Sequence, residues 1–206
     1  MKAIFFDVGG TLLRPWPSVG AVYARVGERH GLRSSAEELE SAFRVAWKKL
    51  KPVGGLTSSS REWWRQLVFT AVPGATDEYF EELFAEFVRA DAWELMPGVR
   101  ETLAEVRARG WHVGVISNWD ERLRPLLRNV GLKDWDSVTI SCEVGVEKPG
   151  REIFLAALRT AGVEAGEAVH VGDSRAEDVA GAEAVGMRAV WVGDGTNLRE
   201  AVSRLG

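Results

Sequence analysis

Residues 3–13 have the sequence AIFFDVGGTLL, in which an apolar run is followed by Asp7 and, after Val8, by two glycines. A short, continuously apolar run with aromatic and β-branched residues is typical of a parallel strand that is buried on both faces. Ligands of open parallel sheets bind beyond the carboxyl ends of the strands. This stretch therefore predicts an α/β fold in which Asp7 lies at the edge of the sheet that binds ligands.

Similar apolar runs recur along the chain and alternate with helical patterns. They predict strands over residues 112–116, 137–140, 168–171 and 189–192. The helical patterns lie at residues 98–109, 121–130, 151–161 and 176–185. Alternation of strands and helices indicates a parallel sheet built from right-handed crossovers, so we expect a Rossmann-like core.

Residues 15–92 follow a different pattern. Amphipathic helical patterns cover residues 18–30, 35–51, 60–72 and 77–90, and no strand is expected between them. The pair Gly54-Gly55 separates two of these patterns. The simplest arrangement is an α-helical cap over residues 15–92, inserted into a Rossmann-like core made of residues 1–14 and 93–206.

Composition and charge narrow the classes of partner. The chain has 206 residues and a formal net charge of -4 at pH 7, so no broad basic field exists to attract nucleic acid or a membrane surface. No apolar run approaches the roughly 18 residues that cross a bilayer, and the N-terminus lacks the pattern of a secretory signal. The single cysteine fits a reducing compartment. We therefore expect a cytoplasmic protein, and the sequence leaves its oligomeric state open.

Polar side chains follow four of the five predicted strands, at the points where the strands end. They are Asp7, Ser117, Asn118, Lys148, Asp173 and Asp178. Because the carboxyl ends of parallel strands meet at one edge of the sheet, we expect these side chains to lie close together.

The acidic members of this set suit phosphoryl transfer. A carboxylate at Asp7 can attack phosphorus and form an acyl phosphate. Asp7 and Asp173 could bind one hard dication, because such ions prefer oxygen ligands. The added charge would neutralise the repulsion between a carboxylate and a phosphate. Gly9 and Gly10 let the backbone turn sharply and approach an anion.

The remaining groups could hold a phosphate. The Ser117 hydroxyl, with Asn118 and nearby backbone N–H groups, can bind phosphate oxygens. Lys148 supplies the compensating positive charge. Asp178 would orient the lysine or the waters of the metal, and Thr11 would hydrogen-bond the turn or cap the next helix. Together these residues predict a site for a small phosphorylated substrate.

The segments DVGGTLL, SN, EKPGREIF and GDSRAED, in this order, resemble the four motifs of the haloacid dehalogenase superfamily of hydrolases. The resemblance covers essentially the whole chain. It implies that Asp7 is the nucleophile and that Mg²⁺ is bound by Asp7, the carbonyl of Gly9 and Asp173. It also implies that Ser117 and Lys148 bind the transferring phosphoryl group.

Two further features resemble the rhythmically expressed gene 2-like branch of this superfamily. They are the tryptophan pair in REWWRQLV, within the expected cap, and the lack of a second acid in the first motif. Two side chains near the motifs remain open to interpretation. Trp119 follows Asn118 and would shape the mouth of the site or pack structurally, and His170 is expected to be a hydrogen-bonded core histidine.

Position 9 departs from the pattern of the family. Its phosphatases usually carry an aspartate there, which protonates the leaving alkoxide and then activates water, whereas Gly9 has no side chain. Loss of a positioned acid or base typically costs about 10²–10⁴-fold in rate. Three explanations follow: a substrate with a good leaving group, an acid supplied by His30 or a glutamate of the cap, or binding without turnover.

Two alternatives to a slow or leaving-group-selective phosphatase remain, and the first is a different hydrolysis on the same fold, of carbon–halogen or carbon–phosphorus bonds. Dehalogenases of the family also lack the second aspartate. Halide displacement needs no Mg²⁺, however, so the metal-type motif GDSRAED with Asp173 argues for a phosphoryl site. Carbon–phosphorus hydrolases of the family use a cap lysine, and Lys48, Lys49 and Lys51 lie in the expected cap. A non-catalytic protein that binds a phosphate ligand is the second alternative.

Overall fold

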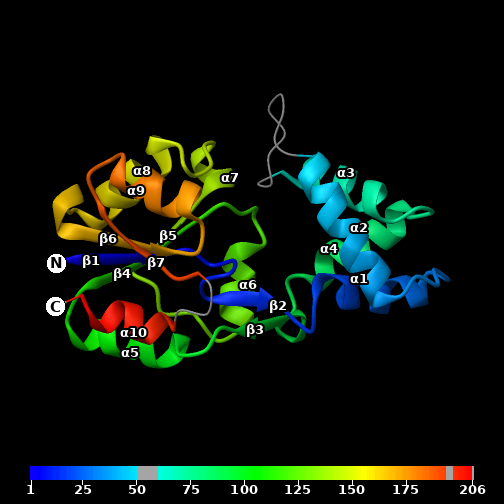
Figure 1. The fold of residues 1–206 in the computed structure, drawn as a ribbon, viewed down its shortest axis with the longest axis horizontal. Coiled ribbons are helices and arrows are strands. Elements are labelled where there is room, and N and C mark those ends of the chain that lie inside the picture. Colours follow the sequence, from blue (N-terminus) through cyan, green and yellow to red (C-terminus); the bar gives the residue numbers. More distant parts are fainter. Residues whose placement is uncertain (51–59, 194–196, 206) are drawn as a thin grey trace. The chain divides into compact units, whose positions relative to one another are not determined.

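A computed structural model describes residues 1–50, 60–193 and 197–205. Its first compact unit comprises Met1–Arg14, Leu95–Glu121 and Leu132–Gly206 and contains a parallel sheet of strand order β5-β4-β1-β6-β7 (Figure 1). The strands are β1 (Ala3–Phe6), β4 (His112–Ser117), β5 (Ser137–Ile140), β6 (Ala168–Gly172) and β7 (Arg188–Trp191). All of β1 is buried, with Phe6 in register with Val115 and Val171. The predicted α/β, Rossmann-like core is confirmed.

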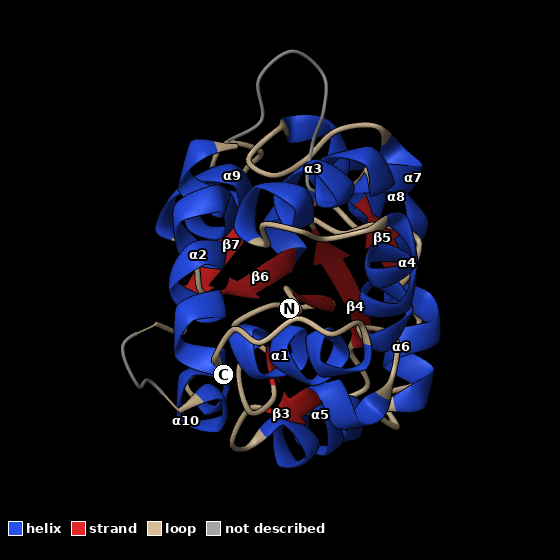
Figure 2. Ribbon diagram, turned by 90° about the vertical axis from the view of Figure 1, so that its right-hand side faces the viewer, coloured by secondary structure: helices blue, strands red, loops and turns tan. Residues whose placement is uncertain are grey.

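Helices cover both faces of this sheet. Helices α5 (Val99–Ala108) and α10 (Leu198–Ser203) lie on one face, and α8 (Arg151–Ala161) and α9 (Ala180–Glu183) lie on the other (Figure 2). Shorter helices are α7 (Ser141–Val144) and η2 (Ala165–Glu167). The stripe that α8 buries includes Ile153, Phe154 and Ala157, which pack with Phe5 and Ile116 of the sheet. This packing fixes the strands whose ends carry the predicted site.

The sequence predicts one helix over residues 176–185, and the structure differs there. The structure has a π-helical turn, η3 (Arg175–Val179), before α9. The N–H groups of Asp178 and Val179 both donate to the Ser174 carbonyl, at 2.9 and 3.2 Å. The Ser174 N–H in turn donates to Asp178 Oδ2 at 2.9 Å. The wider turn therefore folds the Asp178 carboxylate back toward the end of β6, and π-turns of this kind recur at functional sites.

The second compact unit is helical and comprises Pro15–Glu94 and Arg122–Gly131. Its helices are α1 (Val19–Arg29), α2 (Ala36–Lys49), α3 (Arg61–Ala71), α4 (Asp77–Glu86), η1 (Ala90–Ala92) and α6 (Leu123–Asn129). Each of the first four begins after a capping residue whose side-chain oxygen accepts a hydrogen bond from a backbone N–H of the first turn. These capping residues are Ser18, Ser35, Ser60 and Thr76. Tyr23, Trp63 and Tyr79 are buried in its apolar core, which gives this segment a core of its own.

Helix α6 groups with the helical unit, whereas the sequence-based boundaries place all of residues 93–206 in the sheet unit. The Arg122 guanidinium lies 3.5 Å from the centroid of the Phe84 ring and donates to the Phe84 carbonyl at 3.3 Å. Asn129 Nδ2 donates to the Val88 carbonyl at 2.8 Å. Both ends of α6 are thus bound to residues of the helical unit that lie far away in the sequence, and a local pattern does not encode such contacts.

Two short strands that the sequence does not predict, β2 (Leu13–Pro15) and β3 (Trp93–Leu95), pair with each other. The Trp16 N–H donates to the Ala92 carbonyl at 2.8 Å, and the Met96 N–H donates to the Leu12 carbonyl at 2.9 Å. The boundaries between the units, at 14/15 and 94/95, fall within these strands. The chain therefore leaves and re-enters the sheet unit through hydrogen-bonded backbone.

Two of the sequence-based expectations, Lys51 and the Gly54-Gly55 pair, lie outside the described residues. Among the helices that are described, none combines the length and the apolar character needed to cross a bilayer.

Candidate active site

Asp7 lies directly after β1 and is held from two neighbouring segments. The Ser117 hydroxyl, at the end of β4, donates to Asp7 Oδ1 at 2.9 Å. Lys148 Nζ, from the loop before α8, donates to the same oxygen at 2.7 Å. All three side chains are buried. The structure therefore brings together three residues that the sequence placed at separate strand ends, and it orients the carboxylate through one of its two oxygens.

Lys148 is the centre of a buried polar network. Its ammonium also donates to Asp178 Oδ1 at 2.6 Å and to the Ile116 carbonyl at 3.1 Å. Burial alone would lower the pKa of Lys148, but the carboxylates of Asp7 and Asp178 outweigh it and raise that pKa above its usual range. The lysine is therefore a permanent positive charge beside Asp7.

Asp178 is equally well held. Burial would raise its pKa, yet the hydrogen bond from His170 and the charge of Lys148 bring that pKa well below its ordinary value. Three donors therefore surround this carboxylate: His170 Nε2 at 2.8 Å, Lys148 Nζ at 2.6 Å and the Ser174 N–H at 2.9 Å. The predicted role of Asp178 in orienting the lysine agrees with this geometry.

His170 stands in the middle of β6 and is fully buried. Burial lowers the pKa of the imidazole, so it is neutral and donates its Nε2–H to Asp178. Its Nδ1 has no hydrogen-bond partner among the described residues, and the ring meets Phe154 edge-on with centroids 5.4 Å apart. The expectation of a hydrogen-bonded core histidine holds for one ring nitrogen only. The polar histidine inside the apolar strand AVHVG is the sequence feature that could have indicated its link to the site.

Asn118 takes up a supporting position. Its Nδ2 donates to the Lys148 carbonyl at 3.0 Å, and its Oδ1 accepts from the Lys148 N–H at 2.6 Å. Nδ2 also lies 3.3 Å from Glu177 Oε2. Both ends of the amide are thus bonded to the backbone of the residue that carries the ammonium. In this structure the side chain of Asn118 positions Lys148, although the sequence suggested that it binds phosphate directly.

Three carboxylates gather beside the lysine. Ligand oxygens of Asp7, Asp173 and Asp178 all lie within 4.8 Å of one another. Asp173 faces solvent on one side, but partial burial and then the negative charges of Asp7 and Asp178 raise its pKa to about 6. The cluster therefore carries negative charge that Lys148 does not fully compensate, and this charge fits a hard dication with oxygen ligands.

The glycine turn after Asp7 allows this cluster to form. Gly10 has a φ of 76°, and a Cβ there would overlap the carboxylate of Asp173. The Gly10 N–H donates to the Leu13 carbonyl, and the Leu13 N–H donates to the Val8 carbonyl, both at 2.9 Å. These bonds close the turn without using the carbonyl of Gly9. That carbonyl is the metal ligand that the sequence resemblance implies.

Thr11 does not act as expected. Its hydroxyl is buried and has no hydrogen-bond partner in the described part of the chain, so it neither bonds the turn nor caps a helix. The reason is that backbone bonds already close the turn, and Ser18 caps the next helix.

Gly9 faces the indole of Trp119. A Cβ built on Gly9 would lie 3.4 Å from Trp119 Cζ3, an ordinary van der Waals distance, and no other described heavy atom outside residues 8–10 would lie within 4 Å. The position of the usual acid is therefore bordered by an aromatic ring.

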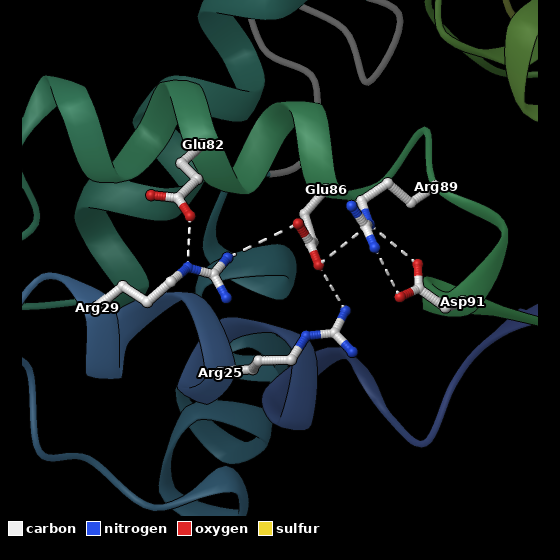
Figure 3. A pocket seen from close by; sticks show the side chains of 6 residues that line it. All are labelled: Arg25, Arg29, Glu82, Glu86, Arg89 and Asp91. Carbon is white, nitrogen blue, oxygen red and sulfur yellow. Dashed lines mark hydrogen bonds and ion pairs between the residues drawn. The ribbon is translucent and has the colours of Figure 1, made fainter.

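Some of the cap residues that were candidates for supplying an acid contact other polar residues of the helical unit. His30 Nε2 lies 2.7 Å from Glu82 Oε2. Within the helical unit a pocket of about 330 Å³ is lined by six charged residues. Figure 3 shows the hydrogen bonds and ion pairs among them as dashed lines. The six residues are Arg25, Arg29, Glu82, Glu86, Arg89 and Asp91. Each of these carboxylates is paired with an arginine of the same pocket, so the pocket is close to neutral overall.

Known proteins resemble this chain along nearly its whole length. Human haloacid dehalogenase-like hydrolase domain-containing protein 3 is 36% identical over 93% of this chain and 82% of its own. The rhythmically expressed gene 2 protein of Drosophila melanogaster is 29% identical over the same two shares, 93% and 82%.

Solved structures of two activities share the fold. A phosphatase of the family from Thermococcus onnurineus is 28% identical, with a TM-score of 0.72 over 100% of this chain and 98% of its own. A 2-haloacid dehalogenase from Pseudomonas syringae is 25% identical, with a TM-score of 0.70 over 100% of both chains. The model of the family described as haloacid dehalogenase-like hydrolase matches residues 1–186. The chain belongs to the haloacid dehalogenase-like hydrolase family.

Proposed function

We propose that this hydrolase is a Mg²⁺-dependent phosphatase that acts on a small phosphorylated molecule through an aspartyl phosphate on Asp7. The observation that carries the proposal is that Asp7 is held by a lysine and lies beside a second carboxylate whose negative charge is not fully compensated. Asp7 is bound by Ser117 and Lys148, while Asp173 lies beside it with a raised pKa. Displacement of a halide does not require a second carboxylate such as Asp173.

The residues that would hold the metal are Asp7, the carbonyl of Gly9 and Asp173. When bound, Mg²⁺ supplies positive charge that offsets the repulsion between the attacking carboxylate and the phosphate. Asp178 stays with Lys148, since three donors already satisfy it. This division leaves one carboxylate for the lysine and one for the metal.

The first half-reaction needs no proton at the leaving group if that group is a stable anion. A carboxylate oxygen of Asp7 attacks phosphorus, the bond from phosphorus to the leaving oxygen breaks, and that oxygen departs with the electron pair. Lys148 and Ser117, which hold Asp7 in the free protein, stabilise the negative oxygens of the transferring group. With glycine at position 9, aryl and acyl phosphates react faster than alkyl phosphates, whose alkoxides need protonation.

The second half-reaction is the slower one for good substrates. Water attacks the phosphorus of the aspartyl phosphate, releases inorganic phosphate and regenerates the Asp7 carboxylate, while its proton passes to solvent. Residue 9 offers no base to that water. We therefore expect aspartyl phosphate to accumulate, which produces an initial burst of the leaving group followed by a slow steady rate.

The experiment is rapid mixing of the protein with 4-nitrophenyl phosphate, with acetyl phosphate and with an alkyl phosphate, each with and without Mg²⁺. The expected result is a Mg²⁺-dependent burst that approaches one equivalent of 4-nitrophenolate per protein. The Asp7→Asn variant should show neither burst nor turnover. Equal release by the wild type and by Asp7→Asn would overturn the proposal.

The second candidate is a 2-haloacid dehalogenase. The similarity to the Pseudomonas syringae enzyme and the missing acid at Gly9 favour it. It predicts halide release from 2-haloacids in the presence of a chelator. Mg²⁺-dependent phosphate release with no halide release would decide for the phosphatase. Ligand-dependent stabilisation with no turnover of either substrate class would instead indicate a phosphate-binding protein.

A further inference from the structure

Trp119 borders the loop that follows Asp7, at Gly9. A side chain at position 9 would begin 3.4 Å from Trp119 Cζ3, so the space beside the nucleophile loop is bounded by the indole. Gly9 is absent from the glycines with positive φ, so its backbone would accept a side chain. The pair thus replaces a polar acid by an apolar aromatic wall.

The backbone of Trp119 is held by three hydrogen bonds to the segment after β5. Its backbone N–H donates to Ser141 Oγ at 2.9 Å, and its backbone carbonyl accepts from the Ser141 hydroxyl at 3.2 Å and from the Cys142 N–H at 3.3 Å. Ser141 is itself buried. The two residues before Trp119 in the chain are Asn118, bonded to Lys148, and Ser117, bonded to Asp7. The backbone that carries the indole is therefore tied to the same loop that orients the nucleophile.

We propose that Trp119 is a specificity-determining residue that selects phosphate monoesters of aromatic alcohols. This inference rests on the phosphatase function proposed above. A phenol-type oxygen has a pKa of about 10 and leaves without a proton donor. Its ring can contact the indole edge-to-face or offset, whereas the small acyl group of an acyl phosphate offers little apolar surface. The missing acid and the aromatic wall thus favour the same substrate class.

The test compares phenyl phosphate with acetyl phosphate in the wild type, Trp119→Phe and Trp119→Ala. An aromatic contact of the usual strength corresponds to about a two- to tenfold change. We expect Trp119→Ala to lower the ratio of kcat/KM for phenyl phosphate to that for acetyl phosphate by this factor, mainly through KM. Trp119→Phe should restore most of the ratio. Trp111→Ala, which removes an indole at the opposite end of β4, is the matched control and should leave the ratio unchanged.

A binding measurement separates this inference from the proposed function. Calorimetry with Mg²⁺ compares phenylphosphonate with methylphosphonate, neither of which has an ester oxygen to release. The wild type should prefer the phenyl compound, and Trp119→Ala should lose that preference. If phosphate esters turn over but the aryl preference does not depend on Trp119, the inference is wrong and the phosphatase stands. If the preference is present without turnover, the phosphatase is wrong; if neither is present, both are wrong.

Discussion

Lys148 and Asp178 form a buried ion pair, with Nζ 2.6 Å from Oδ1 and side chains that are 2% and 1% exposed. The pair lies directly beside Asp7, the proposed nucleophile, because the same ammonium lies 2.7 Å from Asp7 Oδ1. A buried charge that loses one partner is costly, and a lysine that loses its support is misplaced for catalysis. The pair therefore links the stability of the fold to the geometry of the site.

The first prediction concerns Asp178→Asn. Removing one carboxylate leaves the buried Lys148 with Asp7 alone, so the free energy of unfolding should fall by about 3 kcal/mol. The rate constant kcat should fall by about 10- to 100-fold, because the lysine is no longer held from both sides. Urea unfolding and steady-state kinetics measure the two effects. Wild-type stability in Asp178→Asn would show that the pair contributes nothing to the fold.

The second prediction concerns pH and Asp173 in protein kept free of metal by a chelator. Its pKa is raised from 3.8 to about 6, so between these values the folded state binds more protons than the unfolded state. Stability must then fall as pH rises through this window. Asp173→Asn should therefore be more stable than the wild type above about pH 6, by about 1 kcal/mol once solvent screening of this exposed group is allowed for.

The measurement is urea unfolding of the wild type and Asp173→Asn at several pH values between 4 and 8. The difference between the two proteins should be near zero at the acid end and level off above about pH 6. The exposed Asp134→Asn variant, which makes the same charge change, is the control and should show no such rise. A difference that is constant with pH would contradict the electrostatic origin.

Much of the site could be predicted because strand ends are visible in a sequence. Asp7, Ser117 and Asp173 each follow an apolar run, and parallel strands bring such positions to one edge. The contact between Asp7 and Ser117 follows from the pairing of β1 with β4, whereas Lys148 reaches Asp7 from a loop. The fold class was predictable for the same reason, since β1 is apolar on both faces.

Contacts that depend on side-chain direction could not be predicted. The edge of Trp119 facing Gly9, and the amide of Asn118 bonded to the Lys148 backbone, both result from how two loops meet. The grouping of α6 with the helical unit depends on Arg122 and Phe84, which are far apart in the sequence. Neither the spacing of residues nor the composition predicts such side-chain contacts.

The third prediction concerns Thr11→Val. The Thr11 hydroxyl is buried without a partner among the described residues, and an unsatisfied hydroxyl costs about 1–3 kcal/mol. Replacing it by a methyl group of similar size should leave the free energy of unfolding unchanged or raise it. If the hydroxyl serves the bound state, phosphatase activity falls at the same time. A clear loss of stability in urea unfolding would mean that the hydroxyl has a partner in solution.

The fourth prediction concerns Gly9→Asp, with Gly9→Ala as its control. Because a Cβ at position 9 lies at contact distance from Trp119 rather than in overlap, both variants should fold with nearly wild-type stability. Gly9→Asp adds the missing proton donor, so kcat/KM for alkyl phosphates should rise, by at most about 10²–10⁴-fold. Gly9→Ala should bring no such gain, since it adds bulk without an acid. The initial burst with 4-nitrophenyl phosphate should shrink in Gly9→Asp, because a base now assists hydrolysis of the aspartyl phosphate. A folded Gly9→Asp protein with unchanged alkyl phosphatase rate and an unchanged burst would show that acid–base chemistry at this position does not limit the reaction.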